Sequence, residues 1–425
     1  MRARSMPLLA VLSLLCAAIF GATPVAAQNV KLTVLWRTNQ SELDTMEQAF
    51  RAFEAQNPGI EVELIAASGS EGDDKLKVMF ATGNPPDIFA SVFSSALYHY
   101  LYEGMLTDLT PFVERENYDL SDFFPGAVAN FTIAGRYFGL PRGGMSTHGF
   151  YNVSMFNEAG IAPPPTSWED PSWNWDYVAE IAKKLTQRNP DGTFTKAGIQ
   201  FDFWGGGMIN VAPRMWGTSV FGAEFFEFGI GTETALTSPL VVESMERMVQ
   251  LRLVDEVAPA TLPYGGFAGG NVGMRFGGSF ASLANTDFEW GIMPLPRGRP
   301  EIQQRSVTYI GPLNIASSTK HPEEAWELLK FLVGPEGQRI IAPGATIGTS
   351  RLSVIPEYAQ LFPQVPEHVF YEVTQGGFRH GERSNNEIAD FFRVDEIVQR
   401  YQTAMFRGEK DVGAALEEMK AAVEP

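Results

Sequence analysis

Residues 31 to 91 read KLTVLWRTNQSELDTMEQAFRAFEAQNPGIEVELIAASGSEGDDKLKVMFATGNPPDIFAS, and two patterns alternate along this stretch. Each β-rich run is followed by a segment in which apolar side chains recur every three or four residues, the spacing of an amphipathic helix. The expected strands are residues 32–36, 60–65 and 87–91, and the expected helices are residues 43–53 and 74–82. Such strand–helix–strand units predict an α/β fold with a doubly wound, mostly parallel sheet that binds ligands at the carboxyl ends of its strands.

The alternation returns late in the chain, after an irregular middle that contains glycine- and aromatic-rich loops such as residues 204–207. The expected helices are residues 175–187, 239–253 and 322–333, and the expected short strands are residues 290–293 and 307–316. No fixed-period repeat is visible in the sequence, which disfavours a solenoid.

The composition limits both the class of protein and its partners. A chain of 425 residues is long enough for two domains with sizeable cores. Apolar residues make up 44% of it and aromatic residues 12%, which excludes a disordered protein. Because 32 Lys and Arg face 50 Asp and Glu, the formal net charge is −18, and no nucleic-acid partner is expected.

The first 27 residues have the pattern of a cleavable secretory signal peptide. Arg2 and Arg4 precede an apolar run of about fifteen residues, shorter than the roughly twenty that a membrane-spanning helix needs, and small residues end at Ala27. Cys16 lies inside this segment without the neighbours of a lipoprotein signal, so the mature chain is expected to lack cysteine, which suits an oxidising periplasm. No later stretch is expected to span a membrane.

Motifs of the common enzyme classes are missing. None of the five histidines has the spacing of a zinc pair on one helix face, and neither of the main nucleotide-binding glycine motifs occurs, so no metal and no cofactor are expected. The segment around Ser146 lacks the final glycine of a nucleophile elbow. Glycoside hydrolysis stays open as an alternative, because it needs only two suitably spaced carboxylates.

Aromatic residues give the main positive indication of function. Flat apolar rings beside small polar groups suit the C–H faces of sugar rings. Core packing is the stronger explanation for any single ring, so the set carries more weight than its members. The aromatic residues at expected strand ends or in glycine-rich loops are Trp36, Trp173, Trp175, Trp204, Trp216, Tyr264, Phe280 and Tyr309.

Short motifs spread over the chain, in a consistent order, resemble the family 1 extracellular solute-binding proteins of bacterial ABC sugar importers, the maltose-binding-protein-like family. They are FEAQNPGIEV at 53–62, NPPDI at 84–88, GLP at 139–141, YN at 151–152, MFNEAGI at 155–161, PTSW at 165–168, GIMPLP at 291–296, HPEEAW at 321–326, FL at 331–332 and GPEG at 334–337. Each motif is weak alone, whereas their order and spacing are specific.

The resemblance implies a two-lobed periplasmic binding protein fold, type II-like, in which each lobe has a mainly parallel sheet flanked by helices. Three interlobe crossings are implied near residues 140–147, 307–313 and 344–349. Lobe one would then comprise residues 28–141 and 310–345, and lobe two residues 142–309 and 346–425. Ligand would be held between the lobes by hinge closure.

The resemblance also implies which positions contact ligand. They follow the first and third strands, lie on two crossings, or belong to lobe two: Trp36, Thr38, Asn39, Gln40, Ser91, Arg142, Ser146, Trp204, Trp216, Gly278, Ser279, Phe280, Tyr309, Gly311 and Arg379. Backbone geometry explains the glycines equally well, and salt bridges explain Arg142 and Arg379.

The expected function is therefore that of a monomeric periplasmic binding protein that captures a carbohydrate, a small oligosaccharide, and delivers it to a membrane permease without breaking a bond. The first alternative ligand is glycerol-3-phosphate or a glycerophosphodiester, because an arginine at a binding site favours phosphate and GGFR at 376–379 resembles that branch. A secreted glycan-active enzyme and an adhesion or scaffold protein are the remaining alternatives.

Overall fold

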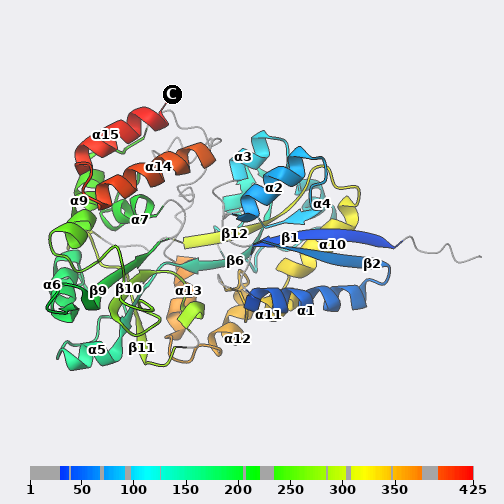
Figure 1. The fold of residues 1–425 in the computed structure, drawn as a ribbon. Coiled ribbons are helices and arrows are strands. Elements are labelled where there is room, and N and C mark those ends of the chain that lie inside the picture. The colour runs from blue at the N-terminus through cyan, green and yellow to red at the C-terminus, as the bar shows by residue number, and fades with distance from the viewer. Residues whose placement is uncertain are drawn as a thin grey trace, which may run out of the picture.

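The computed structural model describes residues 29–37, 40–67, 71–90, 97–124, 126–203, 207–220, 234–283, 286–302, 308–345, 348–375 and 391–424. The expected signal peptide lies outside these residues. The described chain forms two lobes, each built on a five-stranded sheet with helices packed against it, and two strands pass through the region between the lobes (Figure 1). No helix among the described residues is long and apolar enough to cross a membrane.

The sheet of lobe one has the strand order β2-β1-β3-β12-β6. Its strands are β1 (Val30–Arg37), β2 (Ile60–Ala67), β3 (Ile88–Phe89), β12 (Thr308–Ile315) and β6 (Leu140–Ser146). β1 runs parallel to β2 and β3, which confirms the strand–helix–strand units expected from the opening stretch. β12 is antiparallel to both of its neighbours, β3 and β6.

The helices of lobe one follow the sequence periodicity. They include α1 (Gln40–Gln56), α2 (Glu71–Ala81), α10 (Pro322–Val333) and α11 (Pro335–Ile341). Gly83 follows α2 with φ of 72°, a left-handed conformation that favours glycine and stops the helix. The buried apolar stripes of α1 and α10 share one core with β1 and β12, so these helices and strands hold lobe one together.

The sheet of lobe two has the order β11-β7-β10-β9-β8. Its strands are β11 (Trp290–Met293), β7 (Gly149–Asn152), β10 (Val272–Gly277), β9 (Phe194–Asp202) and β8 (Gln187–Arg188). Only β9 and β10 pair in parallel; the other three pairings are antiparallel. The expectation of a mainly parallel sheet is therefore confirmed for lobe one, where β12 runs against the other four strands, and was wrong for lobe two. In lobe two, β8 and β9 are joined by a short turn, which can connect only antiparallel strands. In lobe one, β12 enters the sheet from the side opposite to that of its neighbours β3 and β6.

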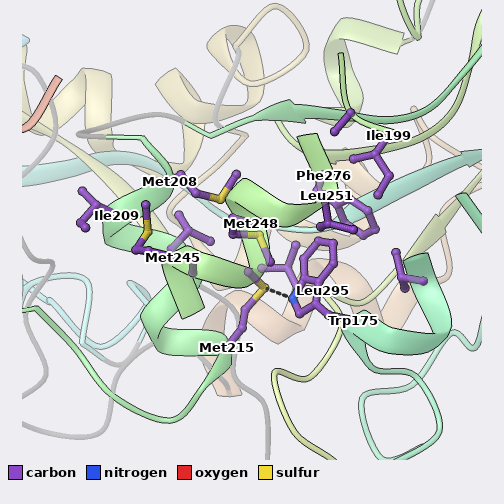
Figure 2. Packing of buried hydrophobic residues seen from close by; sticks show 14 of the residues in the cluster. Trp175, Ile199, Met208, Ile209, Met215, Met245, Met248, Leu251, Phe276 and Leu295 are labelled. Carbon is purple, nitrogen blue, oxygen red and sulfur yellow. Dashed lines mark hydrogen bonds between the residues drawn. The ribbon is translucent and has the colours of Figure 1, made fainter. Parts of the chain in front are cut away.

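The core of lobe two is rich in methionine, a flexible side chain that fills irregular gaps (Figure 2). The helices that enclose it are α6 (Trp175–Leu185), α7 (Met208–Met215), α9 (Pro239–Leu253), α14 (Phe391–Phe406) and α15 (Val412–Val423). The helix expected at 175–187 ends at Leu185, because Gln187 pairs with Lys196 in the sheet instead. Trp173 and Trp175 are buried in this core, so core packing explains both rings.

Shorter elements complete the fold: α3 (Leu97–Tyr102), α4 (Thr110–Glu116), β4 (Thr132–Ile133), β5 (Arg136–Tyr137), α5 (Val153–Glu158), α12 (Ile355–Ala359), α13 (Glu367–Gln375) and the 3₁₀ helices η2 (Ala129–Phe131), η3 (Phe280–Leu283) and η4 (Leu352–Val354).

Two of the expected crossings are β6 and β12, which pair side by side between the lobes (Figure 1). The third, near 344–349, includes residues 346–347, which lie outside the described part of the chain. Just beyond it, the Ser350 hydroxyl donates to the Pro141 carbonyl at 2.7 Å and the Ser353 hydroxyl donates to Asp122 at 2.8 Å. These bonds tie the start of the 346–425 segment to lobe one, whereas α14 and α15 pack in lobe two. The proposed lobe boundaries stay a prediction.

Candidate functional site

A buried polar cluster lies where β1, α1 and the first crossing meet. The Trp36 indole Nε1 donates to Glu42 Oε1 at 2.9 Å, and Arg142 Nη1 donates to the same oxygen at 3.1 Å. The Arg142 guanidinium carbon also lies 4.7 Å from the Trp36 ring centroid. The side chains of Glu42 and Arg142 are only 2% and 11% exposed, so lobe one and the first crossing share a desolvated ion pair.

The segment after the third crossing closes this cluster. Burial raises the pKa of the Tyr358 hydroxyl above its usual range, and the negative charge of Glu42 raises it further. Gly348 has φ of 63°, and a Cβ added there would lie 3.0 Å from the Tyr358 ring. The tyrosine therefore packs against the backbone of the third crossing.

Gln338 joins the crossings through one buried amide. Its Nε2 donates to the Arg142 carbonyl at 3.0 Å and to the Leu332 carbonyl at 2.9 Å. Its Oε1 accepts from the Thr349 hydroxyl at 3.0 Å and from the Ser350 backbone N–H at 3.2 Å. The side chain is fully buried. One amide of α11 thus fixes the first crossing relative to the third.

A second polar group lies at the carboxyl ends of the parallel strands β9 and β10. Arg275 pairs with Asp202 across these strands, and its Nη1 donates to the Ser282 hydroxyl at 3.0 Å. That hydroxyl donates in turn to the Ser279 carbonyl at 2.6 Å. Gly278 has φ of 72°, and a Cβ there would overlap the Arg275 guanidinium, so the turn after β10 needs glycine.

Gly277 provides a test of how tightly this turn is packed. Its φ is 96°, and an added Cβ would overlap the backbone carbonyl of Asp202, which cannot move aside as a flexible side chain can. Gly277→Ala should therefore lower the free energy of unfolding by about 3 kcal/mol or more, measured by urea denaturation. Gly83→Ala is the matched control, since φ there is 72° with open space around it, and should cost about 1 kcal/mol. Equal losses in the two variants would contradict the close packing.

The structure brings some of the expected ligand positions together. Trp36 and Arg142 contact each other, and Gly278 and Ser279 adjoin the Arg275 pair. Ser146 and Gly311 lie on the paired strands β6 and β12. The positions outside the described residues are Thr38, Asn39, Ser91, Trp204 and Arg379, and the side chains of Gln40, Phe280 and Tyr309 are likewise not described.

Trp216 lies elsewhere, in the core of lobe two. It is 2% exposed, and its Nε1 donates to Glu243 Oε1 at 2.9 Å. A Cβ on Gly298 would overlap its ring, so the indole is enclosed. Core packing, the alternative for any single aromatic residue, accounts for this position better than a ligand contact does. Trp36 is as deeply buried, with Arg142 over its ring.

Sequence reasoning missed the residues that complete both polar groups, namely Glu42, Asp202, Arg275, Gln338 and Tyr358. Glu42 lies in the first turn of α1, where an acid is normally a solvated residue that favours the positive end of the helix dipole. Its position six residues after Trp36 was the one available signal. Among the described residues, no group of three or more His, Cys, Asp or Glu side chains is placed to hold a metal ion.

Comparisons with known proteins agree with this architecture. An ABC substrate-binding protein from Listeria monocytogenes, in complex with cycloalternan, superposes with a TM-score of 0.79 at 19% identity and covers 93% of this chain and 98% of its own. Maltose-bound MalE3 of T. maritima has a TM-score of 0.75 at 22% identity, with 92% and 98% covered. UgpB of Mycobacterium tuberculosis, in complex with glycerophosphocholine, has 0.74 at 16% identity, with 91% and 96% covered.

The family comparison is the more specific one. The model described as bacterial extracellular solute-binding protein matches residues 38–339, which is most of the chain and spans both lobes. Proteins of this kind are substrate-binding components of ABC transporters rather than enzymes, and they work with permease partners. The two-lobed α/β fold, the paired crossings and the match over both lobes lead to one conclusion: the chain belongs to the bacterial extracellular solute-binding proteins.

Proposed function

We propose that the protein captures a neutral carbohydrate, a small oligosaccharide, between its lobes and delivers it to a membrane permease. The observation that carries this proposal is the ion pairing of the arginines in the two polar groups. Arg142 pairs with Glu42, and Arg275 pairs with Asp202. Each arginine–carboxylate pair has no net charge and therefore attracts a phosphate less than an unpaired arginine would.

A phosphate ligand would need to compete with these carboxylates. Arginine binds phosphate or carboxylate through parallel N–H donors, so an arginine already paired with an acid has fewer donors and less attraction left. Breaking the Glu42–Arg142 pair would also leave a buried carboxylate without its cation, at a cost of several kcal/mol. Hydroxyl groups of a sugar face no such competition, because they donate to carboxylates and accept from guanidinium groups.

The proposed ligand contacts come from both lobes and from the crossings. Trp204, Phe280 and Tyr309 would supply aromatic faces, while Ser146 and Ser279 would supply polar groups at β6 and at the end of β10. From lobe one, sugar hydroxyls would be hydrogen-bonded by Thr38, Asn39 and Ser91 and by Gln40, the first residue of α1. Because the ligand contacts both lobes, it binds the closed form more tightly and shifts the population toward that form. The permease would then recognise the closed form.

The location and assembly are part of the proposal. The apolar segment before Ala27 supports secretion to the periplasm through a cleavable signal peptide. We expect the mature chain to act as a monomer, since each proposed contact group belongs to this chain.

A thermal-shift screen of residues 28–425 against neutral mono- and oligosaccharides, polyols and glycerophosphodiesters tests the ligand class. A ligand at one hundred times its dissociation constant should add about 2.7 kcal/mol of stability, a shift of several degrees. We expect a neutral oligosaccharide to give the shift and to be recovered intact by chromatography. A shift with glycerophosphocholine alone, lost in Arg379→Ala, would overturn the neutral-sugar assignment, and consumption of the sugar would indicate an enzyme.

Variants of the proposed aromatic contacts test the site. Trp204→Ala and Tyr309→Ala should reduce ligand affinity about tenfold or more, because each loses one stacking face, while the ligand-free melting temperature stays the same. Tyr264→Ala is the matched control, since Tyr264 is 94% exposed and lies outside the proposed contacts. Unchanged affinity in both test variants would remove these residues from the site.

A further inference from the structure

A pocket of about 360 Å³ lies in lobe two, between the end of β9, the start of α7, α9 and α14. Figure 1 shows these three helices grouped together in lobe two. Phe201, Phe203 and Phe406 line the pocket together with Arg252 and Gln402. Its size is at the lower end of the range of small-molecule sites. None of these five residues belongs to the ligand contacts proposed above.

The Arg252 guanidinium in this pocket has no carboxylate partner among the described residues. Its Nε donates to the Ala258 carbonyl at 3.1 Å, and its Cζ lies 5.1 Å from the Phe406 ring centroid. Partial burial lowers its pKa from the ordinary value, because desolvation disfavours the charged form. Largely buried arginines that do pair with a carboxylate are Arg142, Arg247, Arg275 and Arg351.

Gln402 presents a second donor. Its Oε1 accepts from the Ile209 backbone N–H at 3.0 Å, near the start of α7. This bond fixes the orientation of the amide and leaves Nε2, which lies close to Gly207, as a donor without an acceptor among the described residues. The pocket wall therefore combines the Arg252 guanidinium with an amide N–H, and its lining includes no described acidic side chain. A second arginine of the lining, Arg407, pairs with Glu409.

We infer that this pocket binds a small organic carboxylate with an aromatic or apolar body. The two terminal nitrogens of Arg252 suit a carboxylate, which accepts two parallel hydrogen bonds from one guanidinium. The rings of Phe201 and Phe203 are stacked with centroids 5.9 Å apart, and with Phe406 they supply an apolar surface that inorganic phosphate would not use. A bound carboxylate would also offset the desolvation of Arg252.

Isothermal titration with benzoate as the probe tests the inference on the whole mature chain. Benzamide, which has the same ring and nearly the same shape but no charge, is the matched neutral probe. We expect benzoate to bind about tenfold or more tightly than benzamide, because only the anion pairs with Arg252. No heat with benzoate up to about 10 mM, or equal affinity for the two probes, would overturn the proposal.

Three variants place the binding in this pocket. Arg252→Met removes the charge with little change in volume, and Gln402→Glu keeps the acceptor for Ile209 while adding a negative charge; each should weaken benzoate about tenfold or more. Arg400→Met, on the same helix as Gln402 but outside the pocket, should leave it unchanged. Benzoate affinity retained in both pocket variants would overturn the assignment. Because the sugar-induced melting shift is read separately, failure here leaves the proposed function untouched.

Discussion

Replacing Arg142 with methionine should lower the free energy of unfolding by about 3 to 5 kcal/mol in the absence of ligand. The substitution removes the guanidinium from the buried Glu42 carboxylate, which keeps the hydrogen bond from the Trp36 indole. An uncompensated buried charge costs far more than an exposed one, because water cannot solvate it. Urea denaturation followed by tryptophan fluorescence measures the loss.

A double variant separates the charge from the packing. Glu42→Gln combined with Arg142→Met removes both charges while the amide oxygen still accepts from Trp36, so stability should recover to within about 2 kcal/mol of the unmodified protein. Arg115→Met is the surface control, since Arg115 pairs with Glu323 in solvent, and should cost less than about 1 kcal/mol. A double variant as unstable as Arg142→Met would show that packing, not charge, causes the loss.

Gln338→Leu should have a comparable effect, about 3 to 5 kcal/mol, because it removes four hydrogen bonds and leaves their partners in a buried site. The same urea titration measures it. Gln360→Leu, at an exposed position after α12, should change stability by no more than about 0.5 kcal/mol. A small loss in Gln338→Leu would mean that water or rearranged crossings replace the amide.

Local sequence patterns predicted the bounds of those helices and strands that are set by neighbouring residues. The helices α9 and α10 and the strand β11 have the bounds that periodicity and an opening proline indicate. The direction of each strand was not predictable in the same way, because it depends on the lobe from which the chain enters the sheet. β12 joins a sheet whose first three strands end more than two hundred residues earlier, and no local pattern records its direction.

The candidate site shows the same limit. Trp36 and Arg142 were both expected at the site, but their shared partner Glu42 lies one hundred residues from Arg142 in the sequence. An acid in the first turn of a helix has the same local pattern whether solvent or an arginine faces it. Burial, which distinguishes the two, is a property of the folded chain and is absent from the local pattern.

The composition of the lobe two core has a consequence for how the protein is made. That core joins residues from Met155 to Met419, because α14 and α15 pack onto α9 (Figure 1). During synthesis the part of α9 that α14 and α15 cover thus stays exposed until these last helices emerge from the ribosome. Contacts between such distant segments also make folding slow. The nascent chain therefore presents an apolar surface for a long interval, which makes it a natural client for chaperones that hold unfolded chains.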